Sequence, residues 1–306
     1  FGLSFGANIS FNKNKIKSLG SLKTMSNDLT QSYWASSEIG QDYWIEVGGS
    51  VGKMYGYVSD GRYEVSDFER YDEVTETWIL RDGVSSSSAV GTARPGMMKL
   101  KDLDNSGDAN GSDDKRVIGD ANPLHTGGFN INARLYGFDL TANFNWSYGN
   151  DIYNANKIEY TSTSKYLYRN LTSDMAGGKR WNNVDAAGNL VTNMAQLAEM
   201  NQNTTMWSPY TDKYIFSDWA VEDGSFLRLN TLTLGYTMPT TLVKKVGINN
   251  LRFYVTAYNV FCLTSYSGYD PEVSTSRRNG SNLTPGVDYS AYPKSRQFVV
   301  GLNLNF

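Results

Sequence analysis

The feature that most constrains this chain is a strict alternation of apolar and polar residues in segments about ten residues long. From Phe1 to Phe11 every second residue is apolar, and the residues between them are Gly, Ser and Asn. The segment 297–306 repeats the pattern, with apolar residues at the even positions. A period of two places alternate side chains on opposite faces of a β-strand. About ten residues is also the length that a tilted strand needs to cross a bilayer.

The centre of the chain predicts a tight hairpin between two such strands. Apolar residues stand at odd positions in 129–135 and at even positions in 138–148. A two-residue turn at Tyr136 and Gly137 pairs position 135 with 138, so the odd set and the even set fall on one face. The change of parity is what a two-residue hairpin requires.

Three further segments are expected to form strands. One lies within 219–238, where the apolar phase changes and predicts a β-bulge near Asn230. The next lies within 251–261, and the segment 239–250 between them predicts a short helical turn. A seventh strand is expected within 42–58, before a glycine-rich stretch.

The connections between the expected strands are of two kinds. The turns at 136–137 and 239–250 are short, whereas the segments 59–125, 150–217 and 262–295 are long and polar. Long loops on one side and short turns on the other are typical of an outer-membrane barrel. The polar faces of the strands carry Asn, Ser, Thr and Gly, where a soluble sheet would carry Lys, Glu and Asp. The predicted fold is therefore all-β, a transmembrane antiparallel β-barrel.

Composition argues against several other functions. The net charge of −3 disfavours nucleic-acid binding, because nucleic-acid binders usually carry a clustered basic face. No apolar run approaches the roughly 20 residues of a spanning helix. A single cysteine, Cys262, and a single histidine, His125, leave no zinc cluster. The Gly-x-Ser-x-Gly string at 48–52 lacks the elbow and nearby histidine of a hydrolase, so we expect glycines that bend a strand, and no enzyme activity.

Several short motifs, in this order and spacing, resemble one family. They are Ser-Tyr-Gly-Asn-Asp-Ile-Tyr-Asn (147–154), Val-Glu-Asp-Gly-Ser-Phe-Leu-Arg-Leu (221–229), Leu-Thr-Leu-Gly-Tyr (232–236), Ser-Gly-Tyr-Asp-Pro-Glu-Val (267–273), Gly-Val-Asp-Tyr (286–289), Ala-Tyr-Pro (291–293) and the final Phe306. Together they are similar to the last third of the SusC/RagA-type TonB-dependent outer-membrane transporters.

The resemblance implies a 22-stranded barrel whose lumen is plugged by an N-terminal domain. About seven strands are present and nothing resembles the plug, so residues 1–306 are expected to be the C-terminal portion of a longer chain in the outer membrane of a Gram-negative bacterium. The implied function is import of large nutrients, glycan oligomers first and peptides second. The implied partners are a SusD-like surface lipoprotein, the TonB complex acting through the plug, and the lipid bilayer, with a dimer of transporter–lipoprotein pairs left open.

Two alternatives from other classes compete with this interpretation. A self-contained small outer-membrane barrel, acting as an adhesin or porin, would need an even number of strands and a signal peptide. A soluble carbohydrate-binding β-protein would need no detergent for extraction. The loop aromatics suit stacking on sugars or packing against one another, and the sequence does not choose among them: Tyr166, Tyr168, Trp181, Trp207, Tyr210, Tyr214, Tyr266, Tyr269, Tyr289 and Tyr292.

An acidic segment of one long loop follows the spacing of an EF-hand calcium loop. Oxygen donors stand at positions 1, 3, 5, 7, 9 and 12, and Gly107 stands at position 6, where the chain must turn sharply. A Ca²⁺ (or Mg²⁺) site that fixes the surface loop is therefore predicted, and a polar loop without an ion is the competing interpretation. The expected ligands are Asp102, Asp104, Ser106, Asp108 through its carbonyl, Asn110 and Asp113.

The end of the chain generates a prediction about assembly. The last strand resembles the C-terminal signal that the barrel-assembly machinery reads, and a terminal aromatic residue also anchors at the membrane interface. Deletion of Phe306 should therefore reduce the amount of assembled protein in the outer membrane, and unchanged assembly would contradict the idea. The residues of the expected signal are Phe298, Val300, Leu302, Leu304 and Phe306.

Overall fold

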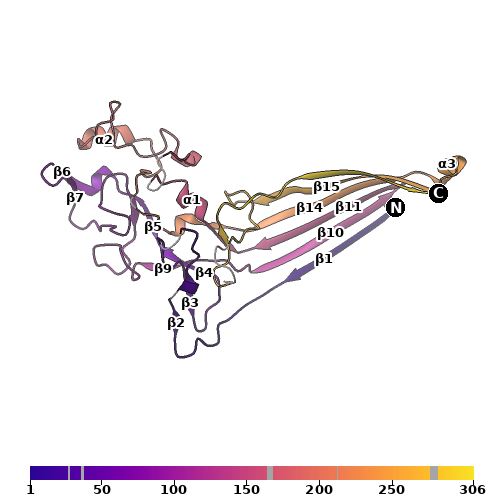
Figure 1. The fold of residues 1–306 in the computed structure, drawn as a ribbon, viewed down its shortest axis with the longest axis horizontal. Helices are drawn as coiled ribbons and strands as arrows, with labels where there is room; N and C mark the ends of the chain where they lie inside the picture. The colour runs from indigo at the N-terminus through magenta and orange to yellow at the C-terminus, as the bar shows by residue number, and fades with distance from the viewer. Residues whose placement is uncertain (27, 36–37, 164–167, 212, 276–281) are drawn as a thin grey trace.

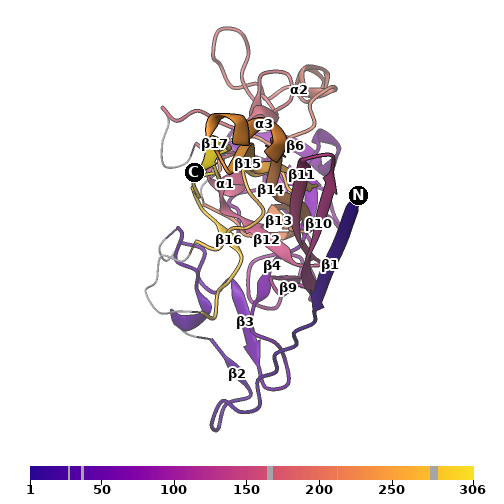
Figure 2. The ribbon, with the colours of Figure 1, turned by 90° about the vertical axis from the view of Figure 1, so that its right-hand side faces the viewer.

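The computed structural model describes residues 1–306 except 27, 36–37, 164–167, 212 and 276–281. A long sheet extends from a body that is built from the connecting loops (Figure 1). In order across the sheet, its six strands are β1 (Gly2–Ser10), β10 (His125–Leu135), β11 (Phe138–Tyr148), β14 (Phe226–Thr237), β15 (Asn250–Thr264) and β17 (Gln297–Asn305). All neighbouring pairs are antiparallel. The sheet is open, with β1 and β17 as its edges, and Figure 2 shows the two chain ends on opposite edges.

The register collects the apolar residues of all six strands on one face. One row of paired residues runs across the whole sheet: Phe5, Ile131, Ala142, Leu232, Ala257 and Phe298. The neighbouring row faces the other way. Its first five members are polar and uncharged, and its last member is apolar: Ser4, Asn132, Thr141, Thr233, Thr256 and Val299. Large apolar side chains on the first face are exposed, Phe298 at 75% for example. Water-soluble surfaces rarely carry a continuous apolar face of this size.

The hairpin and the bulge are both confirmed. Leu135 pairs with Phe138, and the turn residues Tyr136 and Gly137 have positive φ angles of 50° and 86°, as the twist of a two-residue hairpin requires. The register of β14 shifts at Asn230 against both of its neighbouring strands. This extra residue accounts for the change of apolar phase within the strand.

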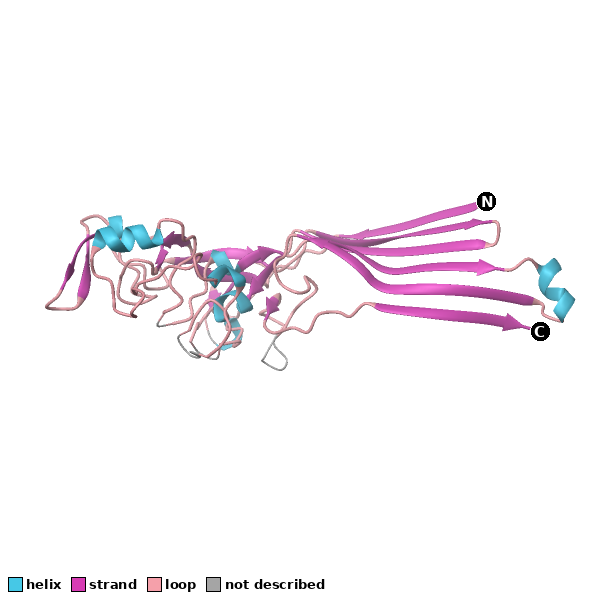
Figure 3. Ribbon diagram, turned by 90° about the horizontal axis from the view of Figure 1, so that it is seen from above, coloured by secondary structure: helices cyan, strands magenta, loops and turns pink. Residues whose placement is uncertain are grey.

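The connections divide as expected. The short helical turn between β14 and β15 consists of α3 (Thr240–Val243) and η5 (Lys244–Val246), and it ends at Gly247 with φ 79°. At the other end of the sheet lie all three long connections, 11–124, 149–225 and 265–296 (Figure 3). The second and third begin and end within eight residues of the expected segments, whereas the first begins at residue 11 and not at 59, because 42–58 does not join the sheet.

The expectation of a seventh barrel strand within 42–58 is wrong. This segment forms two strands of a separate sheet in the loop body, β3 (Tyr43–Glu46) and β4 (Lys53–Tyr57), which lie between β2 (Thr24–Met25) and β9 (Lys115–Asp120). Gly48 and Gly52, with φ angles of 93° and 100°, turn the chain after only four residues. Such strands are too short to cross a bilayer.

The rest of the loop body is a compact set of short elements. These are η1 (Asp28–Thr30), β5 (Ser59–Arg62), η2 (Val65–Asp67), β6 (Phe68–Asp72), β7 (Thr77–Leu80), β8 (Met98–Leu100), β12 (Asp151–Asn154), α1 (Ala155–Glu159), η3 (Ser173–Met175), α2 (Met194–Asn201), η4 (Asp218–Ala220), β13 (Val221–Asp223) and β16 (Val287–Asp288). The first part of the expected strand 219–238 belongs to η4 and β13 of the loop body, and the strand of the long sheet begins at Phe226. Unlike the sheet, the body has apolar cores, centred on Tyr153, Phe68 and Trp181. No helix in the described residues has the length and apolarity to cross a membrane.

The two faces of β11 predict opposite responses to a charge. Ala142 lies in the apolar row and Asn143 on the polar face of the same strand. In the full-length protein, Ala142→Arg should lower the free energy of unfolding by about 2–4 kcal/mol, because the guanidinium would enter lipid near the bilayer midplane. Asn143→Arg should be tolerated. Urea titration of both variants in lipid vesicles checks this, and a larger loss for Asn143→Arg would reverse the facing.

Candidate functional site at the junction of sheet and loops

The motifs that carry the family resemblance meet where the sheet enters the loop body. Arg228 belongs to the motif in 221–229 and lies on the polar face of β14, opposite Asn145 of β11. Asp270 and Glu272 belong to the motif in 267–273, in the long connection between β15 and β17. The structure brings these groups together across 42 residues of sequence.

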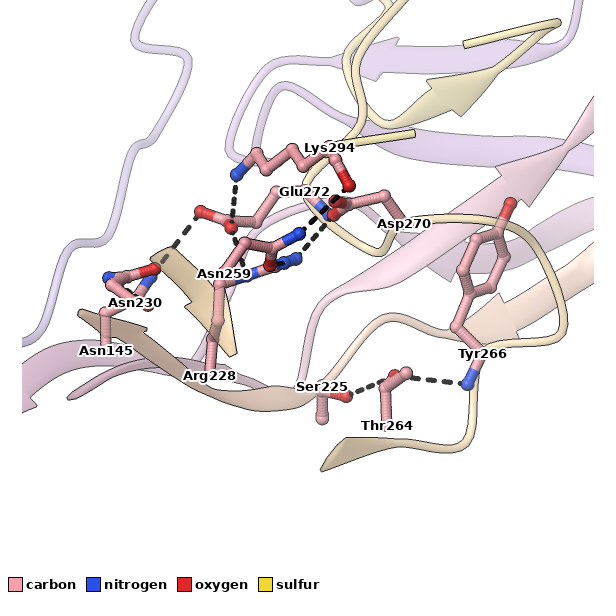
Figure 4. Close-up of polar contacts among 10 residues, drawn as sticks. All are labelled: Asn145, Ser225, Arg228, Asn230, Asn259, Thr264, Tyr266, Asp270, Glu272 and Lys294. Carbon is pink, nitrogen blue, oxygen red and sulfur yellow. Dashed lines mark hydrogen bonds and ion pairs between the residues drawn. The ribbon is translucent and has the colours of Figure 1, made fainter. Parts of the chain in front are cut away.

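Arg228 is the centre of this junction. Its side chain is nearly fully buried, with 2% of the residue exposed. Nη1 donates to Asn259 Oδ1 at 2.5 Å, Nη2 donates to Asp270 Oδ1 at 2.6 Å, and Nε lies 2.8 Å from Glu272 Oε2 in an ion pair (Figure 4). A guanidinium offers a planar fork of donors that suits two carboxylates at once. Two negative charges therefore compensate one buried positive charge.

A second cation and two amides extend the network. Lys294 Nζ lies 2.5 Å from Glu272 Oε2, and the Lys294 carbonyl accepts a hydrogen bond from Asn259 Nδ2 at 2.9 Å. Asn230, the extra residue of the bulge, donates through Nδ2 to Asn145 Oδ1 at 2.7 Å (Figure 4). Both sides of the connection 265–296 are thus tied to the sheet. We call Arg228, Asn259, Asp270, Glu272 and Lys294 the Arg228 clamp.

A second cluster at the junction surrounds Glu222. Its Oε1 accepts hydrogen bonds from Asn154 Nδ2 at 2.9 Å and from Ser267 Oγ at 2.8 Å, and its Oε2 accepts from Ser267 N at 2.9 Å. Lys157 Nζ lies 3.4 Å from the same carboxylate. Burial acts to raise the pKa of Glu222, but these hydrogen bonds and the Lys157 charge outweigh it and lower the pKa. Three of the motifs therefore interlock through one ionised carboxylate.

The acidic loop adopts a turn that gathers three carboxylates. Oxygens of Asp102, Asp104 and Asp114 lie within 4.8 Å of one another. Asp102 accepts hydrogen bonds from the backbone N–H groups of Ser106 at 3.1 Å and Gly107 at 2.8 Å. Oxygen atoms that converge in this way suit a hard divalent cation.

The remaining expected ligands are placed differently. The Asp108 carboxylate turns away and accepts from Ser86 Oγ at 2.5 Å, Ser88 N at 2.9 Å and Asn110 Nδ2 at 2.7 Å. Although burial opposes it, this set of donors lowers the pKa of Asp108 to about 2. The carbonyl of Asp108 accepts from Ser106 Oγ at 3.2 Å. Asp113 is exposed, and its neighbour Asp114 completes the group instead.

Asp114 also holds the two ends of the acidic loop together. It is 1% exposed, and its two oxygens accept hydrogen bonds from Leu103 N at 2.8 Å and Asn110 N at 2.9 Å. Sequence spacing alone missed this residue, because the count of twelve positions ended one residue too early.

The other singled-out residues have structural surroundings. Ser50 donates to Asp120 Oδ2 at 3.1 Å in the β3–β4 turn, and His125 Nδ1 accepts from Trp146 Nε1 at 3.0 Å. Among the loop aromatics, four are buried, namely Trp181, Trp207, Tyr214 and Tyr266. Four are exposed, namely Tyr168, Tyr210, Tyr269 and Tyr292. Tyr289 is partly exposed, and Tyr166 lies outside the described residues.

Comparison with known proteins finds homologues among the TonB-dependent receptors. No protein-family profile matches the chain. The TonB-dependent receptor P3 of Formosa agariphila is 30% identical over 308 residues, which cover 100% of this chain and 27% of that receptor. The chain is homologous to the SusC/RagA-type TonB-dependent receptors. SusC of Bacteroides thetaiotaomicron, another such receptor, is 31% identical over 149 residues, 47% of this chain and 13% of SusC.

Solved structures agree on the fold. A chain of the RagAB peptide importer in its closed-closed state superposes with a TM-score of 0.65 at 20% identity, covering 99% of this chain and 27% of that chain. The open-open state gives a TM-score of 0.62. The six-stranded sheet with its loop body therefore has the fold of part of a receptor of this family, and the chain spans about a quarter of the length of these relatives.

The Arg228 clamp predicts a large effect of removing its cation. In the full-length receptor, Arg228→Met leaves Asp270 buried without a positive partner, which should destabilise the junction by about 3–5 kcal/mol. Hydrogen exchange at the amides of Asp270, Glu272 and Val273 should become faster by the factor that this loss of free energy corresponds to. The double variant Arg228→Met/Asp270→Asn should recover part of the protection. Arg116→Met, at an exposed arginine of the loop body, is the control, and equal effects in both single variants would contradict the clamp.

Proposed function

We propose that this chain is part of the wall and the outer loops of a TonB-dependent importer in the outer membrane of a Gram-negative bacterium. The observation that carries the proposal is the continuous apolar face across six paired strands, with all three long connections at one end. In lipid, backbone groups at a sheet edge find no partner. Because β1 and β17 are open edges, we propose that further strands complete the wall to a barrel of 22 strands in all. This chain then lies at the C-terminal end of the barrel.

The chemistry of the inner wall supports large, neutral nutrients as cargo. On the polar face the strands carry amides and hydroxyls with few charges, which can exchange hydrogen bonds with sugar hydroxyls. The amides on this face include Asn8, Asn130, Asn132, Asn143 and Asn145. Glycan oligomers are therefore the first proposed substrates. Peptides are the second, since the structurally similar RagAB is a peptide importer.

The proposed partners follow from the two ends of the sheet. The loop body, with its own cores, offers a firm outer platform on which a SusD-like lipoprotein can dock. Energy for import is proposed to come from the TonB complex acting through a plug domain outside this chain. Pairs of transporter and lipoprotein could then associate into a dimer.

Uptake by living cells tests this function. Deletion of the gene should abolish import of a fluorescently labelled oligosaccharide that supports growth, while uptake of the corresponding monosaccharide stays unchanged. Deletion of TonB should have the same effect, because the proposed transport is energised. Continued oligosaccharide import in both strains would refute the proposal. Import of labelled peptides in place of glycans would keep the importer and change its substrate class.

We also propose that the acidic loop binds Ca²⁺ through Asp102, Asp104 and Asp114. An ion there would compensate three carboxylates held within 4.8 Å and fix a surface loop. Asp104→Asn should weaken Ca²⁺ binding by at least about tenfold in isothermal titration of the full-length receptor, because it removes one charged ligand. Asp113→Asn removes a neighbouring charge outside the group and is the matched control. No heat of binding in the unmodified receptor, or equal losses in both variants, would exclude the site.

A further inference from the structure

The segment that follows β1 carries a run of positive charge without acidic partners. Residues 11–25 contain Lys13, Lys15, Lys17 and Lys23 and no Asp or Glu. All four lysines are exposed, and within the described part of the chain none of them forms an ion pair. We call Lys13, Lys15 and Lys17 the rim lysines. They are not part of the Arg228 clamp or of the acidic loop.

The rim lysines continue the alternation of β1. Odd positions from Leu3 to Phe11 carry the apolar side chains, and the next three odd positions carry lysine. Asn14 lies between them and faces the loop body, where its Oδ1 accepts from Val51 N at 2.7 Å and its Nδ2 donates to Asn122 Oδ1 at 3.1 Å. In an extended chain, neighbours of such a residue point the opposite way. By this alternation Lys13 follows Phe11 on the side of the apolar face of β1, whereas the stem of Lys15 passes the loop body, with its Cε 3.9 Å from the position of a Cβ on Gly48.

Their height along the sheet is set by an aromatic rim. The Phe11 ring centre lies 5.8 Å from that of His125, and His125 stacks on Tyr148 at 5.1 Å. Aromatic rings of this kind gather where lipid tails give way to headgroups. Lys13 comes three residues after Ser10, the last residue of β1, so at most about 10 Å of extended chain separates it from the strand. Charges thus replace apolar residues just beyond the rim.

We infer that the rim lysines bind the phosphate groups of lipids in the outer leaflet around the barrel. This inference rests on the proposed function, because it needs the apolar face of β1 in lipid. A lysine can lay its aliphatic stem along apolar surface and place its ammonium at the headgroup level. Each ammonium is a compact charge that attracts anionic headgroups within a Debye length. Three of them, spaced by two residues, can engage neighbouring phosphates at the same time.

A lipid-selectivity measurement tests the inference. The full-length receptor is reconstituted into phosphatidylcholine vesicles, and spin-labelled phosphatidic acid and phosphatidylcholine report the relative association of each lipid with the protein. The unmodified receptor should prefer phosphatidic acid by about threefold or more, and 1 M NaCl should reduce the preference. The variant K13Q/K15Q/K17Q should lose most of it. A control variant removes the same charge from exposed positions of the loop body, Lys101, Lys179 and Lys213.

The outcomes separate the inference from its alternatives. Loss of the preference in the rim variant alone supports it. An unchanged preference in the rim variant, or an equal loss in the control, overturns it. Removal of the preference by 10 mM inorganic phosphate at constant ionic strength would show that the lysines hold a soluble anion, and this also overturns it. Failure of the unmodified receptor to insert into vesicles would refute the proposed function and the inference with it.

Discussion

A backbone N–H or C=O group in the hydrocarbon of a bilayer has no water to bind, so a strand that crosses must exchange all its hydrogen bonds with neighbouring strands. The sheet follows this constraint closely: each of the 11 residues of β10 has a partner in β11. Because side chains alternate with a period of two, a slip of one residue would move the apolar set to the polar face. Register, facing and the length of the hairpin turn are therefore consequences of a single requirement.

The bulge in β14 is informative because it departs from that regular ladder. Asn230 has no paired residue in the backbone register of either neighbouring strand, and across from it Asn259 of β15 has a positive φ of 51°. Both residues use their side-chain amides at the junction, Asn230 toward Asn145 and Asn259 toward Arg228 and Lys294. The interruption of the ladder therefore coincides with the place where the wall binds a loop. An unbroken strand would leave fewer polar groups free for that contact.

The sequence predicted what depends on local period and failed where distant contacts decide. Alternation predicted the six strands, the hairpin and the bulge, because each of them changes the pattern of apolar and polar residues within about ten positions. In 42–58 the same alternation indicated only a strand with one buried face. It could not show to which sheet that strand belongs. The acidic loop shows the same limit. Tyr55 and Tyr57 of β4 donate to the carbonyls of Ser112 and Asn110, which helps to set the path of the chain before Asp114. The spacing of the acidic residues within the loop gives no information about these contacts.

The sheet and the loop body are stabilised in different ways, and this explains the polar chemistry between them. The body buries apolar side chains in its own cores, whereas the sheet turns its apolar face outward. An apolar contact at the junction could form in several positions, because the hydrophobic effect has no direction. A buried guanidinium with two carboxylates has few satisfactory geometries, and leaving any partner unmatched is costly. The Arg228 clamp thus contributes position more than stability. It holds the connection 265–296 at one height on the polar face of the sheet, and so fixes where this loop lies relative to the strands.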